Sequence, residues 1–288
     1  MKEKIAIIDP LGSHGSSHHF YIFGQVKGLI ENDLDVSIYT NNITKNPHFE
    51  GVLFYQFYKN IFSINSSIIS GFRYLFGSFF SIFHAKFSGV RICHYHLFHV
   101  NILVLFDFLL TKFLRMKVVY TIHDVVSFNE KRNFNFLNNF LYMFADKILT
   151  HNRFSKDILC NININIKTKI DIIPHGNYTS FINLYEDQNK SREKLSFPKD
   201  KKILLFFGMI KKVKGLDVLL KALKDVISVN KDIVLVIAGK VWNHDFSVYQ
   251  SLIDEHNLSD HCIVHNNFIS HHDLDFYYSS ADLVVLPY

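Results

Sequence analysis

The chain has 288 residues and a mass of 33.7 kDa, which suggests about two domains. Hydrophobic residues make up 48% and charged residues 20%, so the chain can bury a sizeable core and global disorder is excluded. The net charge is +5, a mild basic excess. The three cysteines lie far apart with no CxxC pair, which argues against a disulfide scaffold and fits a reducing compartment: Cys93, Cys160 and Cys262.

Apolar runs and amphipathic segments alternate along the first part of the chain. We expect strands at residues 5–9, 36–40, 52–57, 91–95, 118–123, 148–151 and 170–173. Helical spacing of apolar residues predicts helices at 22–30, 101–114, 134–145 and 154–159. This alternation predicts an α/β fold with a parallel sheet covered on both faces.

The alternation lapses in a polar stretch and then restarts. Strands are expected at 203–207, 233–238, 262–268 and 283–287, with helices at 216–227, 248–256 and 273–280. We assign residues 1–178 to a first Rossmann-like, doubly wound domain, 179–200 to a linker and 201–288 to a second such domain. The second domain stops at its fourth strand, where such folds usually have five or six, so we expect it to be incomplete and the chain to be a fragment or a truncated product.

A loop with three lysines follows the first strand of the second domain. The strand ends at Gly208, and the next helix begins near Lys214. The free N–H groups of a helix N-terminus suit a diphosphate, and Lys211 and Lys214 add full charges beside them. Gly208 and Gly215 leave room for the backbone to approach a ligand. The alternative is a solvated basic turn.

Two features of the first domain lie where strands end. Gly12 and Gly15 frame a loop after the first strand, although a GxxG pattern alone is weak evidence for ligand contact and does not match the GxGxxG of nicotinamide-binding folds. His123 and Asp124 follow a buried strand, whose end faces the ligand crevice in an open α/β sheet. His123 is therefore a candidate for substrate contact, the alternative being a structural His123–Asp124 hydrogen bond.

Histidine-rich segments raise the question of a metal site. No segment combines histidines with nearby cysteine or glutamate at ligand spacing, and none matches HExxH. We therefore predict no metal site and expect His94 and His96, which alternate on a predicted strand, to line a cleft or to pack. The segments are His14/His18/His19, His94/His96/His99 and His271/His272.

The segment between Glu50 and Asp107 contains no acidic residue and carries fifteen aromatic side chains. Its basic residues are Lys59, Arg73, Lys86 and Arg91. Aromatic anchors beside basic groups predict a face, within residues 52–91, that binds an anionic membrane. A phenylalanine-rich core is the alternative, and nucleic acid is not expected because no RNP or helix-turn-helix motif is present. The apolar run at 97–114 is interrupted by polar and charged residues and makes a poor spanning helix.

Six segments, in order, resemble the motifs of family 4 glycosyltransferases. Residues 207–222 read FG-x-I-x-x-x-KGLD-x-LL-x-A, which is similar to the donor-domain signature of that family. The others are TIHD (121–124), ADKILTHN followed by SK (145–156), IPHGNY (173–178), LVIAG (235–239) and ADLVVLP (281–287). The resemblance therefore covers nearly the whole chain.

The resemblance implies a GT-B fold, in which two Rossmann-like domains face each other across a cleft and bind the acceptor and the nucleotide-sugar. It implies a retaining transfer that needs no metal or other cofactor, with basic residues stabilising the leaving diphosphate. Lys214 stands at the family's lysine position, and Lys211 is expected to replace the arginine that the family often has at the position of Met209. With Gly208 these lysines form the expected donor diphosphate site.

The resemblance also implies roles in the first domain. His123 is the candidate catalytic residue, which contacts the transferring sugar without acting as a nucleophile. The residues expected to line the acceptor side of the cleft are Gly12, His14, Gly15, Asp124, His175 and Gly176. The family's Glu-x7-Glu segment and its C-terminal helix would follow Tyr288, and without them we expect the activity of the chain as given to be compromised.

The sequence thus predicts a hexosyl-transferring enzyme of bacterial polysaccharide or lipid-linked glycan assembly. Its expected partners are a nucleotide-diphosphate sugar, a glycan or lipid-linked acceptor and an anionic membrane surface. Its expected location is the cytoplasm or the inner face of the cytoplasmic membrane. Two alternatives stay open: another GT-B sugar-nucleotide enzyme such as an epimerase, which would need catalytic carboxylates, and a non-catalytic remnant of a glycosyltransferase.

Overall fold

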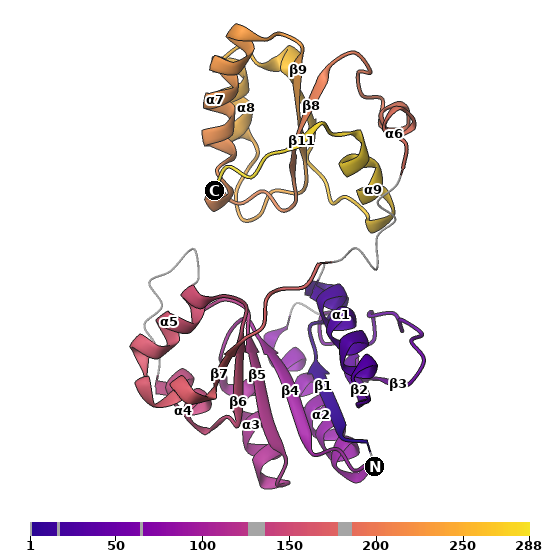
Figure 1. The fold of residues 1–288 in the computed structure, drawn as a ribbon, viewed down its shortest axis with the longest axis vertical. Helices are drawn as coiled ribbons and strands as arrows, with labels where there is room; N and C mark the ends of the chain where they lie inside the picture. The colour runs from indigo at the N-terminus through magenta and orange to yellow at the C-terminus, as the bar shows by residue number, and fades with distance from the viewer. Residues whose placement is uncertain (1, 16–17, 64–65, 126–135, 178–185) are drawn as a thin grey trace. The chain divides into compact units, whose positions relative to one another are not determined.

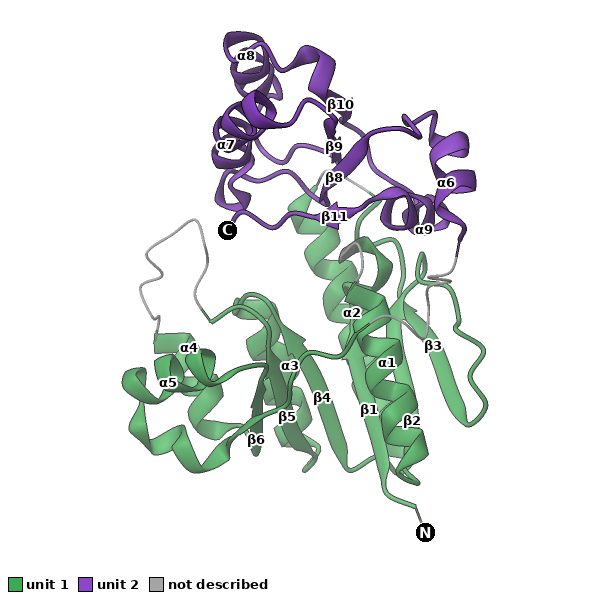
Figure 2. Ribbon diagram, turned by 45° about the horizontal axis from the view of Figure 1, so that its top comes forward, with its two compact units in different colours: residues 1–180 green, residues 181–288 purple. Residues whose placement is uncertain are grey.

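The computed structural model describes residues 2–15, 18–63, 66–125, 136–177 and 186–288. The chain divides into two compact units, residues 1–180 and 181–288 (Figures 1 and 2). Each unit is built around its own parallel β-sheet. The fold class is therefore α/β, as the alternation of strands and helices predicts.

The first unit contains a seven-stranded sheet in the order β3-β2-β1-β4-β5-β6-β7, and all neighbouring strands are parallel. The order reverses between β1 and β4, because the chain adds β2 and β3 on one side of β1 and then crosses to the other. Ligand sites in open α/β sheets lie beyond the carboxyl ends of the strands at such a point. The strands are β1 (Lys4–Asp9), β2 (Asp35–Asn41), β3 (Val52–Tyr58), β4 (Ile92–Leu97), β5 (Lys117–Ile122), β6 (Lys147–Thr150) and β7 (Ile170–Ile172).

Helices cover both faces of this sheet. Figure 1 shows α1 (His18–Glu31) on the near face and α2 (Ser67–Phe87) and α3 (Ile102–Phe113) on the far face. The chain adds α4 (Phe136–Phe144) and α5 (Arg153–Ile162) beside the later strands. Residues 134 and 135 of the expected helix at 134–145 lie outside the described residues. Among the helices that the structure describes, none has the length and hydropathy needed to cross a membrane.

No helix is expected from the sequence where α2 lies. The side chain of Ser66 caps its N-terminus by accepting from the Ile69 amide. Gly77 lets the helix approach β3 closely, because a Cβ at this position would lie 2.6 Å from the Tyr58 ring. The helix buries mostly small residues and exposes phenylalanines, which reverses the usual amphipathic pattern. Its buried residues are Gly77, Ser78, Ser81, Ile82 and Ala85.

The second unit contains a four-stranded parallel sheet in the order β10-β9-β8-β11. One face of α7 (Leu216–Val229) is buried through five leucine and isoleucine residues, as their spacing predicts. The strands are β8 (Lys202–Phe207), β9 (Ile233–Ala238), β10 (Cys262–His265) and β11 (Leu283–Val284), and the other helices are α6 (Gln188–Leu195), α8 (Ser247–Glu255) and α9 (His271–Ser280).

Part of the segment expected to be a linker forms α6 and belongs to the second unit. Arg192 on this polar helix is buried, and its guanidinium donates to the Ser280 carbonyl and, at 2.7 Å, to the Asp282 carboxylate. A buried guanidinium with several acceptors can anchor a helix that has no apolar stripe. The polar composition of this segment predicts a linker, because the helix has no apolar stripe for a pattern to detect. Residues 179–185 of the expected linker lie outside the described residues.

Candidate functional site

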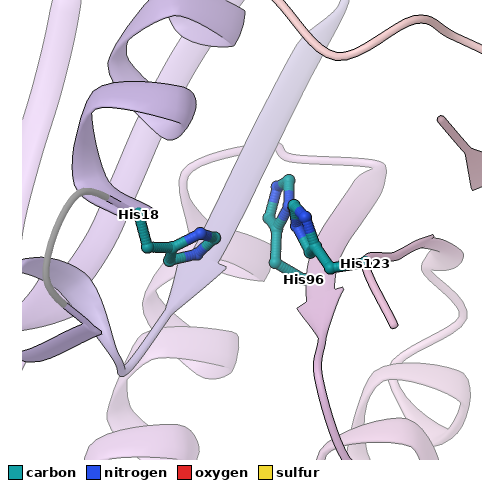
Figure 3. A group of neighbouring side chains, drawn as sticks. All are labelled: His18, His96 and His123. Atoms are coloured by element: carbon teal, nitrogen blue, oxygen red, sulfur yellow. The ribbon is translucent and has the colours of Figure 1, made fainter. Parts of the chain in front are cut away.

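Histidines gather beyond the carboxyl ends of the central strands of the first unit. His96 lies on β4, His123 directly follows β5, His151 follows β6, and His18 is the first residue of α1. Because these strands are parallel neighbours, their ends meet at one edge of the sheet. Figure 3 shows the rings of His18, His96 and His123 turned toward one another.

Three of these imidazoles form a hydrogen-bonded chain. His151 Nδ1 lies 3.0 Å from the Ile173 carbonyl oxygen, His151 Nε2 lies 3.2 Å from His123 Nδ1, and His123 Nε2 lies 3.0 Å from His96 Nδ1. A carbonyl oxygen only accepts, so His151 donates from Nδ1 and must accept at Nε2 when it is neutral. His123 then donates to His151 and accepts from His96. The Ile173 carbonyl thus sets the tautomer of every ring in the chain.

The surroundings favour the uncharged form of each ring in the histidine chain. Burial, together with the neighbouring histidines, lowers the pKa of His123 to about 2. Burial likewise places the pKa of His96 well below its usual value and lowers that of His151. Each ring loses hydration and has other imidazoles close by, so a proton on one ring is disfavoured.

His123, the predicted catalytic residue, lies in an aromatic environment. Its ring stacks on Phe98 with centroids 4.6 Å apart, and the Tyr21 ring meets it edge-on at 5.0 Å. Both of its ring nitrogens lie within hydrogen-bond distance of other histidines, His96 on one side and His151 on the other. Asp124 itself is exposed.

The glycine loop of the first unit forms a short 3-10 turn at Gly12–Gly15. Gly12 has a φ of +46°, and a Cβ there would lie 1.9 Å from the Thr44 hydroxyl oxygen. Its amide donates to the buried carboxylate of Asp9 at 3.2 Å. The exposed ring of His14 stacks on Phe62, with centroids 3.7 Å apart. Gly12 therefore has a packing reason to be glycine, and the ring of His14 packs on Phe62.

His175, also predicted as a site residue, lies beside this chain. Its ring centroid is 4.8 Å from that of Tyr21 and 5.1 Å from that of His151. Its Nδ1 lies 2.7 Å from the carbonyl oxygen of Gly176. The structure thus brings His175 and His123 into one cluster, together with Tyr21 and His151, which were not predicted as site residues.

The lysine loop of the second unit runs from β8 to α7. Gly208 has a φ of +108°, and its carbonyl oxygen occupies the place where a Cβ on Gly239 would stand. Lys214 Nζ lies 3.4 Å from the position of a Cβ on Gly208, so the ammonium group lies over the Gly208 backbone. Burial lowers the pKa of Lys214, and the positive charge of Lys211 lowers it further. Lys212 is exposed. Lys211, Lys214 and Gly208 are therefore close together, and Lys212 faces solvent.

Both units match described protein families. Residues 20–180, more than half of the chain, match Glycosyltransferase Family 4. Residues 187–288 match Glycosyl transferases group 1. Spore coat protein SA of Bacillus subtilis (strain 168) is 34% identical over 89 residues, a region that covers 30% of this chain and 23% of that relative. The chain thus matches less than a quarter of the length of this curated relative.

Two solved structures share the fold. The catalytic domain of starch synthase IV from Arabidopsis thaliana, bound to ADP and acarbose, has a TM-score of 0.71 at 12% identity, covering 100% of this chain and 78% of that one. Alr3699/HepE from Anabaena, in complex with UDP and glucose, has a TM-score of 0.68 at 16% identity, covering 98% and 73%. At these identities the likeness is one of fold.

Proposed function

Because the chain belongs to Glycosyltransferase Family 4 and has the GT-B fold, we propose that it moves a hexosyl group from a nucleoside-diphosphate sugar to a glycan or lipid-linked glycan, with retention at the anomeric carbon. The transfer belongs to bacterial polysaccharide assembly at the inner face of the cytoplasmic membrane. The observation that carries this proposal is the close approach of Lys211, Lys214 and the Gly208 backbone before α7.

The lysine loop suits a diphosphate for electrostatic reasons. Neither Lys211 nor Lys214 forms an ion pair with a carboxylate among the described residues. Two ammonium groups that repel each other and are partly desolvated are stabilised when an anion binds between them. The N-terminus of α7, which begins at Leu216 directly after the loop, adds the partial positive charge of the helix dipole. Because the lysines already supply positive charge to the leaving diphosphate, we propose a transfer without a metal cofactor.

In the first unit, we assign the acceptor side to the carboxyl ends of the strands. His123 is proposed to meet the transferring sugar as a neutral ring. A sugar hydroxyl would donate to His123 Nε2 in place of His96, which now holds that position at 3.0 Å. His175, Asp124 and the Gly12 loop are proposed neighbours of this contact.

The transfer itself gives the test. Purified protein is incubated with UDP-, GDP- and ADP-linked hexoses, with and without lipid-linked glycans as acceptors, and release of the nucleoside diphosphate is measured. One donor should release its nucleoside diphosphate only when an acceptor is present, and NMR of the product should show the donor's anomeric configuration. Conversion of the sugar without an acceptor would instead indicate an epimerase, and an inverted product would contradict retention.

We further propose that α2 binds the membrane that carries the acceptor. Several apolar side chains on this helix are exposed, including Phe72 at 60%, Phe76 at 63% and Phe87 at 84%. This exposure argues against the alternative of a phenylalanine-rich core. A cavity of about 470 Å³ beside these side chains is lined by Phe57, Lys59, Asn60, Arg73, Phe76, Gly77 and Phe80.

The charges around these exposed phenylalanines favour an anionic surface. None of the four basic residues of the acid-free segment pairs with a carboxylate among the described residues. Arg73 donates to the Asn60 carbonyl and the Ser63 hydroxyl, which leaves its positive charge unneutralised. Exposed aromatic groups beside unpaired cations are typical of proteins that bind anionic bilayers.

A further inference from the structure

We propose that His18, His96 and His123 form a binding site for one divalent transition-metal ion, Zn²⁺ being the ion to test. Each residue offers a ring nitrogen, and the three nitrogens lie within 4.8 Å of one another. The residues come from the start of α1, from β4 and from the turn after β5, so no spacing along the chain indicates the group (Figure 3).

The separation of the rings fits a shared ion. The ring centroids lie 5.6 Å apart for His18 and His96, 5.2 Å for His18 and His123, and 5.3 Å for His96 and His123. Three imidazoles bound tetrahedrally at about 2.0–2.1 Å per Zn–N bond place their ring centres about 5 Å apart. Rotations of the rings, without a change of fold, would therefore bring the nitrogens onto one ion.

Two ring nitrogens in this group lack hydrogen bonds. His18 Nε2 and His96 Nε2 are buried and have no hydrogen-bond partner among the described residues. Asp9 Oδ1 lies 3.4 Å from His18 Nε2, within ion-pair distance but without hydrogen-bond geometry. Buried polar nitrogens are normally satisfied, and one left without a partner costs free energy. A metal ion would use these lone pairs, and the carboxylate of Asp9, which is 3% exposed, would offset its charge.

The surroundings also favour ligation. A histidine binds a metal through the lone pair of a neutral ring. The second nitrogen of His123 bonds to His151, which is anchored on the Ile173 carbonyl, and this is the kind of outer contact that orients metal-binding histidines. Binding at His123 Nε2 would replace the hydrogen bond from His96. An all-imidazole set suits zinc, copper or nickel rather than magnesium or calcium.

The site does not depend on the proposed transfer. The proposed reaction uses no metal, so the ion is no cofactor for it. A bound ion would instead occupy His123, the residue that we propose to contact the sugar. We therefore expect zinc to inhibit the transfer. This last consequence rests on the proposed function, whereas metal binding can be measured without any substrate.

The test titrates Zn²⁺ into protein that carries no polyhistidine tag and has been stripped with a chelator, in competition with a chromophoric indicator. The wild-type chain is expected to bind one ion tightly, and His18→Asn and His123→Asn each to weaken this binding about 100-fold. His99→Asn is the matched control, because His99 is exposed and lies outside the group. Thermal unfolding of each variant without zinc establishes that it is folded, and zinc should raise the unfolding temperature of the wild type and of His99→Asn only.

Co²⁺ gives a second readout, since its visible spectrum distinguishes tetrahedral from octahedral coordination. A tetrahedral spectrum that His18→Asn abolishes supports the site. Absence of binding by the folded wild-type chain, equal weakening by His99→Asn and His18→Asn, or unchanged affinity in both variants of the group would each overturn it.

Discussion

At the scale of single residues, Asp107 shows how burial changes the behaviour of a carboxyl group. It lies on α3 with 1% of its surface exposed, and the Tyr74 hydroxyl donates to its Oδ2 at 2.6 Å. Its Oδ1 has no hydrogen-bond partner among the described residues. Burial raises the pKa of Asp107 to about 7. Between about pH 4 and 7 the native state therefore binds more protons than the unfolded chain, and this contribution to stability is lost as the pH rises through that window.

Replacing Asp107 by asparagine should remove this loss of stability at higher pH. The amide that replaces the carboxyl group cannot ionise and can still accept the hydrogen bond from Tyr74. Asp107→Asn is therefore expected to be more stable than the wild type at pH 8, by on the order of a few kcal/mol, and to differ little at pH 4. Denaturant unfolding of the first unit at both pH values measures the difference. Asp157→Asn changes the same charge at an exposed position and should have little effect. An equal gain at pH 4 and pH 8 would show that ionisation is not the cause.

Individual site residues differ in how far the sequence reveals them. Lys211, Lys214 and Gly208 lie within seven residues, so one strand–loop–helix segment brings them together and the sequence predicts their proximity. His18, His96, His123 and His151 come from four elements and meet only through the strand order β1-β4-β5-β6. Local periodicity does not determine the order of parallel strands, so the sequence does not predict this cluster, although His96, His123 and His151 each follow or end a predicted strand.

At the scale of elements, α2 departs most clearly from what a hydrophobic pattern predicts. Its small buried residues allow close packing on β3, while its phenylalanines face solvent. By contrast, α7 buries five leucine and isoleucine residues and was predicted for that reason. A rule that assigns apolar faces to the core does not predict a helix whose apolar side chains are exposed.

Vesicle binding tests the role proposed for α2. The wild-type chain should sediment with vesicles that contain anionic lipid and should be released as salt rises, because exposed charges are screened beyond about 10 Å at 0.1 M. Phe72→Ser combined with Phe76→Ser should reduce binding several-fold by removing apolar anchors. Phe154→Ser, which changes a 70% exposed phenylalanine on α5, is the control. Equal sedimentation with neutral vesicles would contradict the electrostatic part, and equal loss in the control would contradict the assignment to α2.

At the scale of the whole molecule, the chain combines two α/β units, each with its own parallel sheet and its own cluster of candidate residues. Regular alternation made the fold class predictable, because strands buried on both faces and amphipathic helices leave clear patterns. The helix within the expected linker was not predictable in this way, since the buried Arg192 guanidinium, rather than apolar residues, anchors it. The two family matches, one in each unit, agree with this division of the chain.

Calorimetric titration with UDP, GDP and ADP tests the donor site most directly. One of the three should bind, and Lys214→Ala should weaken its affinity by roughly one to two decades, because a charge-assisted hydrogen bond typically contributes about 1.5–3 kcal/mol. Lys212→Ala removes the same charge from an exposed position in the same loop and should change the affinity far less. If Lys214→Ala leaves the affinity unchanged, or if both variants weaken it equally, the loop is not the diphosphate site and the proposed donor chemistry is wrong.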